Sequence, residues 1–260
     1  MKKSAVIIFI LLLLIIGFFF YWQKDYNAGF NFNNPLKTPE VIPENSIATS
    51  EEIATSTPFE IPKGEISRGN QSKKQLIFTF DCGAGTNSAE KILEITAKHG
   101  IRATFFSTGK FAEKNPEVIK KFSVAGHEIF NHTYSHPYLT KITDEQIKEE
   151  FAKANEIISK LTGATTKPYF RPPYGSRNQH VLDIAQSLGY QSVFWTIDAL
   201  DWMQDKTAEQ VKAQIYSKIT PGAIILMHVG DDITGQILDE VFIKLENDGY
   251  KIISLSEGLK

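Results

Sequence analysis

The sequence predicts an α/β fold in which about seven parallel strands form a (β/α) barrel. Two observations carry this prediction. From about Lys73 onward, short apolar runs alternate with amphipathic stretches of helical period, which favours parallel strands joined by crossover helices. In addition, a cluster of polar residues follows nearly every apolar run, as expected where the loops of a barrel meet at one face. A barrel is therefore favoured over an open sheet.

Each predicted strand is a short apolar run bounded by polar or turn-forming residues. The seven runs cover residues 76–80, 103–107, 128–131, 168–170, 191–196, 223–227 and 251–254. Three of the intervening helices have recognisable start signals. These are the capping-box pairs Thr143 with Gln146 and Thr207 with Gln210, and Asn87 with Glu90 ahead of the first helix, which Gly100 ends.

The length of 260 residues suffices for one sizeable core plus extensions. The net charge is −2, so no global basic field favours nucleic acid as a partner. A single cysteine cannot form an internal disulfide, so the folded part has to rely on its core.

The N-terminal segment has the pattern of a membrane anchor. Residues 5–22 are apolar and uncharged, and Lys2 and Lys3 precede them. This length spans a bilayer, and the basic flank keeps the N-terminus cytoplasmic. Residues 18–22 are bulky where a cleavage site would need small side chains. We therefore expect residues 1–22 to be a cytoplasmic stub and a transmembrane signal-anchor, with secretion after signal cleavage as the alternative.

Residues 23–72 have the composition of a flexible tether. They are rich in Ser, Thr, Asn and Glu and contain five prolines. Such a segment buries little surface and reads as an extended linker. The predicted order is anchor, tether and one folded domain over residues 73–260, which would lie outside the cytoplasm at the cell membrane.

The first polar cluster is T-F-D-C-G over residues 79–83, at the end of the first apolar run. Asp81 and the only cysteine, Cys82, stand there side by side, where a strand passes its last side chains to a loop. An aspartate at a strand end is usually a turn-former, and a single buried cysteine is commonly a small hydrophobe. For Cys82, the packing and the functional interpretation are both open.

Four further clusters follow later strands. His132 and His136, four residues apart, share one face if their segment is helical, so both could bind one cation. A coincidental surface pair is the default for the histidines alone, but Asp81-Cys82 favours a metal. R-P-P-Y-G over residues 171–175, D-A-L-D-W over 198–202 and L-M-H over 226–228 complete the series. Each of these motifs, taken singly, is more often an ordinary part of the core or of a loop. Five such motifs at successive strand ends are hard to attribute to chance.

These five motifs, in this order, resemble those of the polysaccharide deacetylase family, which is carbohydrate esterase family four with its NodB-homology domain. The similarity covers about residues 74–258. It implies a distorted (β/α) barrel as a single catalytic domain, and metal-dependent removal of N- or O-acetyl groups from sugars.

The resemblance also implies a role for each matching residue. His132 and His136 would bind a divalent metal, usually Zn²⁺, which polarises the acetyl carbonyl and acidifies a water. Asp81 would be the general base, and Arg171 would hold it ionised.

On the leaving-group side, the resemblance implies that the Tyr174 amide donates to the oxyanion and that His228 is the general acid. Asp201 would keep His228 protonated. Trp202 and Leu226 would form the walls of the acetyl pocket. Asp198 stays open between a substrate contact and a structural cap.

Cys82 departs from the family pattern, which has a second aspartate there as third metal ligand. A thiolate could replace it, giving a Cys-His-His set that suits catalytic zinc. Alternatively, Cys82 points away and only two histidines remain.

An anchored, outward-facing sugar deacetylase would meet the cell wall first, so peptidoglycan N-acetyl sugars are the leading glycan substrate. Two alternatives stay open: a metal-independent amide hydrolase on the same barrel, and a catalytically impaired glycan-binding module.

Overall fold

The computed structural model describes residues 63–260. The predicted anchor and most of the predicted tether lie outside this part of the chain. Within it, no helix combines the length and the apolar character needed to cross a membrane.

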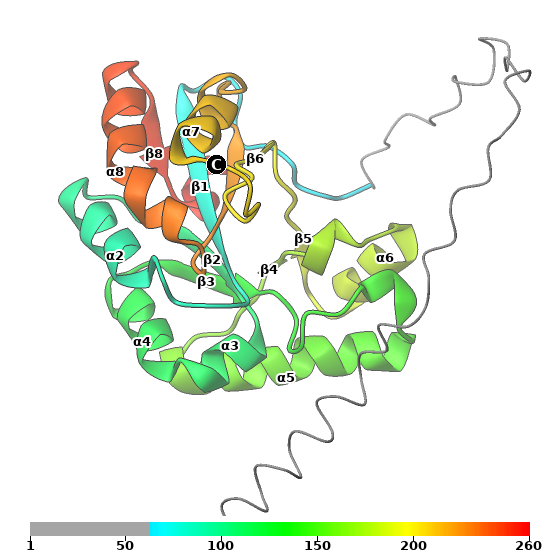
Figure 1. Ribbon diagram of the computed structural model, residues 1–260. Helices are drawn as coiled ribbons and strands as arrows, with labels where there is room; N and C mark the ends of the chain where they lie inside the picture. The colour runs from blue at the N-terminus through cyan, green and yellow to red at the C-terminus, as the bar shows by residue number, and fades with distance from the viewer. Residues whose placement is uncertain (1–62) are drawn as a thin grey trace, which may run out of the picture. The chain divides into compact units, whose positions relative to one another are not determined.

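Eight strands form one sheet of parallel pairs, curled with its helices on the outside (Figure 1). The order is β5-β4-β3-β2-β1-β7-β6, and β8 pairs with β1. The strands are β1 (Gln75–Cys82), β2 (Thr104–Ser107), β3 (Glu128–Asn131), β4 (Tyr169–Phe170), β5 (Gln191–Ser192), β6 (Ile197–Asp198), β7 (Ile224–His228) and β8 (Lys251–Ile253). The predicted α/β barrel is confirmed in a distorted form.

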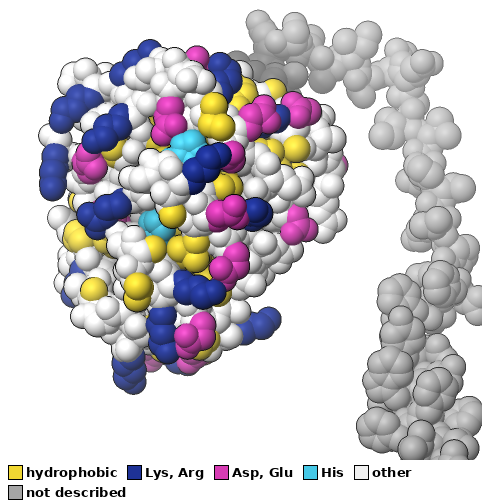
Figure 2. All heavy atoms as spheres, turned by 90° about the vertical axis from the view of Figure 1, so that its left-hand side faces the viewer, with side chains coloured by type: hydrophobic (Ala, Val, Ile, Leu, Met, Phe, Trp, Pro, Cys, Tyr) yellow, Lys and Arg dark blue, Asp and Glu magenta, His cyan; other side chains and the backbone are white. Residues whose placement is uncertain are grey.

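The helices connect successive strands, as right-handed crossover units require. They are α2 (Ala89–Lys98), α3 (Gly109–Lys114), α4 (Pro116–Val124), α5 (Asp144–Thr162), α6 (Gln179–Ser187), α7 (Ala208–Tyr216), α8 (Asp232–Asn247) and α9 (Leu255–Gly258), with the short 3-10 turns η1 (Leu139–Lys141) and η2 (Pro173–Gly175). Charged side chains of both signs are interspersed over the face on which α2 and α8 lie (Figure 2).

Strand β1 separates two cores because successive side chains of a strand point to opposite faces. Phe78, Phe80 and Cys82 belong to the large cluster between the sheet and the helices. Ile77 belongs to the inner cluster, which fills the interior of the barrel. Asp81 lies one residue before Cys82 and therefore faces the inner side at the end of the strand.

A segment just before β1 packs on the barrel between β5 and β7. Ile66 pairs with Val193, and Arg68 pairs with Ala223. Glu65 accepts two hydrogen bonds from Arg177, each 2.8 Å long. These residues have the composition of the predicted tether, but in the structure they are part of the folded domain, which therefore begins before residue 73.

Six of the seven predicted strands are found within a few residues of their expected ends. The seventh, predicted over 191–196, is instead two short strands, β5 and β6, because residues 194–196 between them are not in strand conformation. Val193, next to this break, still donates to the Phe170 carbonyl of β4 and also pairs with Ile66. Both predicted capping boxes, at the starts of α5 and α7, are confirmed. The first helix differs: Ser88 rather than Asn87 is its N-cap. The Ser88 hydroxyl accepts a hydrogen bond from the backbone N–H of Gly235 on α8 and does not cap its own helix.

Candidate active site

A cavity of about 540 Å³ opens at the carboxyl ends of the central strands. Its walls combine two histidines of the β3 loop, acidic residues of three strand ends and aromatic side chains. Seven of the ten predicted site residues line it: Asp81, His132, His136, Tyr174, Trp202, Leu226 and His228. Arg171 and Asp201 lie behind the wall and contact lining residues, whereas Cys82 does not line the cavity.

Asp81 and His228 end adjacent strands at the same level, because the register of β1 and β7 pairs them directly. Behind Asp81, the fully buried guanidinium of Arg171 donates from Nη1 to Oδ1 at 2.8 Å. Burial raises the pKa of Asp81, but Arg171 and two nearby histidines lower it more, so that the pKa lies below its ordinary value. The carboxylate is therefore ionised and oriented at neutral pH.

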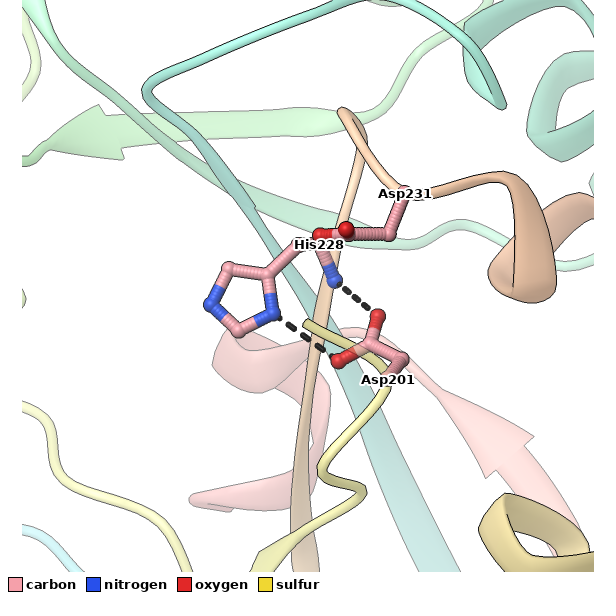
Figure 3. A group of neighbouring side chains, drawn as sticks. All are labelled: Asp201, His228 and Asp231. Atoms are coloured by element: carbon pink, nitrogen blue, oxygen red, sulfur yellow. Dashed lines mark hydrogen bonds and ion pairs between the residues drawn. The ribbon is translucent and has the colours of Figure 1, made fainter. Parts of the chain in front are cut away.

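Asp201 holds His228 from below with both carboxylate oxygens (Figure 3). Oδ1 bonds to Nδ1 of His228 at 2.9 Å, and Oδ2 accepts from the backbone N–H of His228 at 2.7 Å. The hydroxyl of Thr234 also donates to Oδ2. Burial lowers the pKa of His228, but the hydrogen bond and the charge of Asp201 outweigh it and bring the pKa to about 9. His228 is therefore a cation at neutral pH.

Asp231 joins this pair in the one group of three potential metal ligands found among residues 63–260. It comes from the loop between β7 and α8 and lines the cavity. Asp201 and His228, however, direct their polar atoms at each other (Figure 3). We therefore interpret the group as a hydrogen-bonded Asp201–His228 pair with the carboxylate of Asp231 beside it.

His132 and His136 bring their Nε2 atoms to 3.2 Å of each other. Zn–N bonds of 2.0–2.1 Å at a tetrahedral angle put two ligand nitrogens about 3.3 Å apart, so the pair fits one ion. Nδ1 of His132 donates to the carbonyl of Arg171 at 2.8 Å. The proton of the neutral ring is therefore on Nδ1, and Nε2 carries the lone pair that can bind a metal. Burial lowers the pKa of both rings, to about 4 for His136, so both are neutral. Oδ2 of Asp81 lies 3.4 Å from Nε2 of His132.

The two histidines meet because of a loop and not because of a shared helix face. Their segment follows β3 without helical structure, and His136 has a positive φ of 63°. In the described residues, the non-glycine residues with positive φ are Thr133, His136, Tyr174 and Leu200, of which His136 and Tyr174 line the cavity. Each such conformation costs about 1–3 kcal/mol and needs support from its surroundings.

Glu150 supplies part of that support from α5. Its carboxylate accepts from the backbone N–H groups of Tyr134 and Ser135 at 2.8 and 2.6 Å, and from the Ser135 hydroxyl at 2.6 Å. Sequence reasoning missed this residue because nothing marks a helical glutamate fourteen positions after a histidine as its support.

Cys82 is fully buried among the apolar side chains between β1 and the helices. Burial, together with the charge of Asp81, raises the pKa of its thiol well above the ordinary value. The thiol also forms no group of three close ligand atoms with the histidines. Of the two alternatives for Cys82, the structure matches the one in which the side chain points away. The reason is the alternation of β1, which continues through Cys82.

The remaining predicted residues form the floor and rim. Leu226 is buried, whereas Tyr174 and Trp202 are 59% and 50% exposed. Asp198 fits both of its open interpretations: it lines the cavity, and it accepts from the Leu200 amide at 2.9 Å.

Comparisons with known proteins identify the family of this chain. The polysaccharide deacetylase family model matches residues 68–193. The chain is 36% identical over 191 residues to the peptidoglycan-N-acetylmuramic acid deacetylase PdaA of Bacillus subtilis, which covers 73% of each chain. It is 33% identical to a peptidoglycan-N-acetylglucosamine deacetylase of Bacillus cereus, covering 72% of this chain and 69% of the relative. The chain belongs to the polysaccharide deacetylase family.

Solved structures give the same assignment. A pseudoenzyme of carbohydrate esterase family 4 from Bacillus anthracis superposes with a TM-score of 0.73 at 32% identity, covering 77% of this chain and 70% of the other.

Proposed function

We propose that this chain hydrolyses N-acetyl groups of cell-wall amino sugars, with peptidoglycan as the leading substrate. One observation carries the proposal. Asp81 and His228 stand in register on β1 and β7 across one cavity, and their separate partners push their pKa values in opposite directions. A pair of titratable groups separated in this way supplies one base and one acid at the same pH.

The chain's own residues divide the proton transfers between them. Asp81, ionised and oriented by Arg171, accepts a proton from the attacking water. Cationic His228 donates a proton to the departing amine, and Asp201 stabilises that cation through Nδ1. Leu226 and Trp202 exclude water from the side of the cavity that receives the acetyl methyl group.

A divalent metal fits the facing Nε2 atoms of His132 and His136, and Zn²⁺ is the ion that suits imidazole ligands at this separation. When bound, it polarises the acetyl carbonyl and acidifies a water. The two histidines would hold it, and the Arg171 carbonyl fixes the tautomer of His132. Cys82 is not part of this donor set.

The substrate class and the location are argued from relatives and from the N-terminus. Relatives from Bacillus subtilis and Bacillus cereus are named peptidoglycan deacetylases. Residues 5–22 have the composition of a single-pass anchor that would hold the domain outside the cytoplasm, next to the wall. Interaction with the lipid bilayer is part of this proposal.

A glycan-binding module with little turnover is the second candidate. Two observations favour it: the Cys82 thiol does not face the histidines, and a family 4 pseudoenzyme superposes well on this chain. Against it, Asp81, Arg171, Asp201 and His228 form a connected acid-base apparatus that binding alone does not need.

Acetate release from N-acetylglucosamine oligomers and from peptidoglycan tests the proposal. The full-length chain is compared after zinc loading and after chelation, with Asp81→Asn as the shape-matched inactive control. Release that requires zinc and Asp81 supports a metal-assisted deacetylase. Release that survives chelation identifies the metal-independent amide hydrolase instead. Glycan binding without release in either sample favours the binding module.

A further inference from the structure

Aromatic side chains are exposed at the mouth of the cavity. Among residues 63–260, the exposed large apolar side chains are Val124, Tyr138, Tyr174, Trp202 and Ile243. Tyr174 and Trp202 line the cavity. Tyr138 lies just outside it, 53% exposed, and packs against Tyr174. Exposed apolar surface that continues from a site commonly binds a ligand.

The Tyr138–Tyr174 pair is a parallel stack. Its ring centroids are 4.1 Å apart and the planes differ by 14°. The inner ring also meets His136 edge to face, with centroids 4.4 Å apart. A continuous series of three rings therefore leads from the candidate metal ligand His136 to the surface.

The backbone holds this stack in position. Tyr174 has left-handed dihedrals, φ 55° and ψ 11°, inside the short turn η2. Tyr138 is the residue directly before η1. Stacking covers only one face of each ring, and more than half of each tyrosine is exposed. The stack therefore presents aromatic surface to solvent beside the cavity.

We propose that the Tyr138–Tyr174 pair is an accessory subsite for a pyranose ring of the glycan chain. The ring it holds neighbours the sugar whose acetyl group lies in the cavity, so the inference rests on the proposed function. A pyranose with equatorial substituents has axial C–H groups on both faces. Its faces are apolar while its rim of hydroxyls stays in water, which matches a flat, half-exposed aromatic surface.

This subsite would make the affinity for a glycan depend on the length of its chain. Tyr138 does not line the cavity, so a single sugar bound there should not reach it, whereas an oligomer should extend over it. Loss of the outer ring should therefore weaken the binding of long chains and leave single sugars unaffected.

Binding of N-acetylglucosamine and of its pentasaccharide to the full-length chain, followed by NMR titration, tests the inference. Tyr138→Ala should weaken pentasaccharide binding about 2- to 10-fold, the range of one aromatic stacking contact, and leave monosaccharide binding unchanged. Tyr138→Phe keeps the ring and should bind like the wild type. Ile243→Ala, an exposed apolar truncation on α8, is the matched control and should change neither affinity.

Three results would overturn the subsite: unchanged pentasaccharide affinity in Tyr138→Ala, an equal loss for both sugars, or no pentasaccharide binding by the wild type. Acetate release, measured in the same samples, keeps the proposed function separate. A length-dependent loss of affinity in a protein that releases no acetate leaves the subsite standing and removes the deacetylase.

Discussion

Replacing Asp201 by Asn should move the alkaline limb of the pH–rate profile. His228 acts as an acid only while protonated, so the wild-type rate falls as pH rises through its pKa of about 9. Asn keeps the shape of Asp201 but removes the charge, so the pKa of His228 falls from about 9 toward its ordinary value of about 6.5; burial lowers it, and the charges of Asp81 and Asp231 still raise it. For a variant pKa of about 6.5, the protonated fraction at pH 7.5 drops from about 97% to about 9%, which predicts a loss of up to about tenfold in kcat.

The same substitution has a stability consequence with a defined sign. The folded-state pKa of His228 lies above the unfolded value, so the pair stabilises the fold below about pH 6.5, and this stabilisation is lost as pH rises through about 9. The shift corresponds to about 3 kcal/mol at most.

NMR titration of the His228 ring gives the pKa directly, and acetate release from pH 5 to 10 gives the rate profile. Asp239→Asn is the matched control, because Asp239 on α8 bonds to His99, the C-cap of α2, and neither residue lines the cavity. An Asp201→Asn protein whose His228 still titrates near pH 9 would refute the assignment of this pKa to Asp201.

Three further predictions concern the supports of the site and of the fold. Cys82→Ala should leave zinc affinity within about twofold and destabilise the fold by about 1 kcal/mol, because only a buried contact is lost; calorimetric zinc titration showing a large loss would identify the thiol as a ligand after all. Glu150→Ala should weaken zinc binding about 10- to 100-fold by releasing the loop before His136, whereas exposed Glu156→Ala on the same helix should not. Burial lowers the pKa of His99, but hydrogen bonds to Asp239 and Glu246 raise it above the ordinary value. His99→Gln should therefore destabilise the fold more at about pH 6 than at about pH 9 in urea unfolding, and equal losses at both would contradict this.

Local patterns were sufficient for most of the architecture. Alternating strand and helix periods predicted the parallel barrel, and the pairs Thr143 with Gln146 and Thr207 with Gln210 predicted two helix starts. These signals succeed because each depends on neighbours within a few residues. The predicted strand over 191–196 ends early, at residues 194–196, and Val193 beside that break pairs with Ile66, more than a hundred positions earlier, which no local pattern indicates.

The sequence by itself determined which chemical groups end the strands. Asp81, His132, Arg171 and His228 each stand at or just after an apolar run, and a strand that forms from such a run places them at its carboxyl end. The tertiary structure alone decided which of these groups lie next to one another. The register of β1 and β7 set Asp81 beside His228, and a strained loop, supported by Glu150, turned two histidines toward each other. It also turned Cys82 into the apolar core, because a strand alternates its side chains between two faces and only the assembled sheet defines which face holds the site.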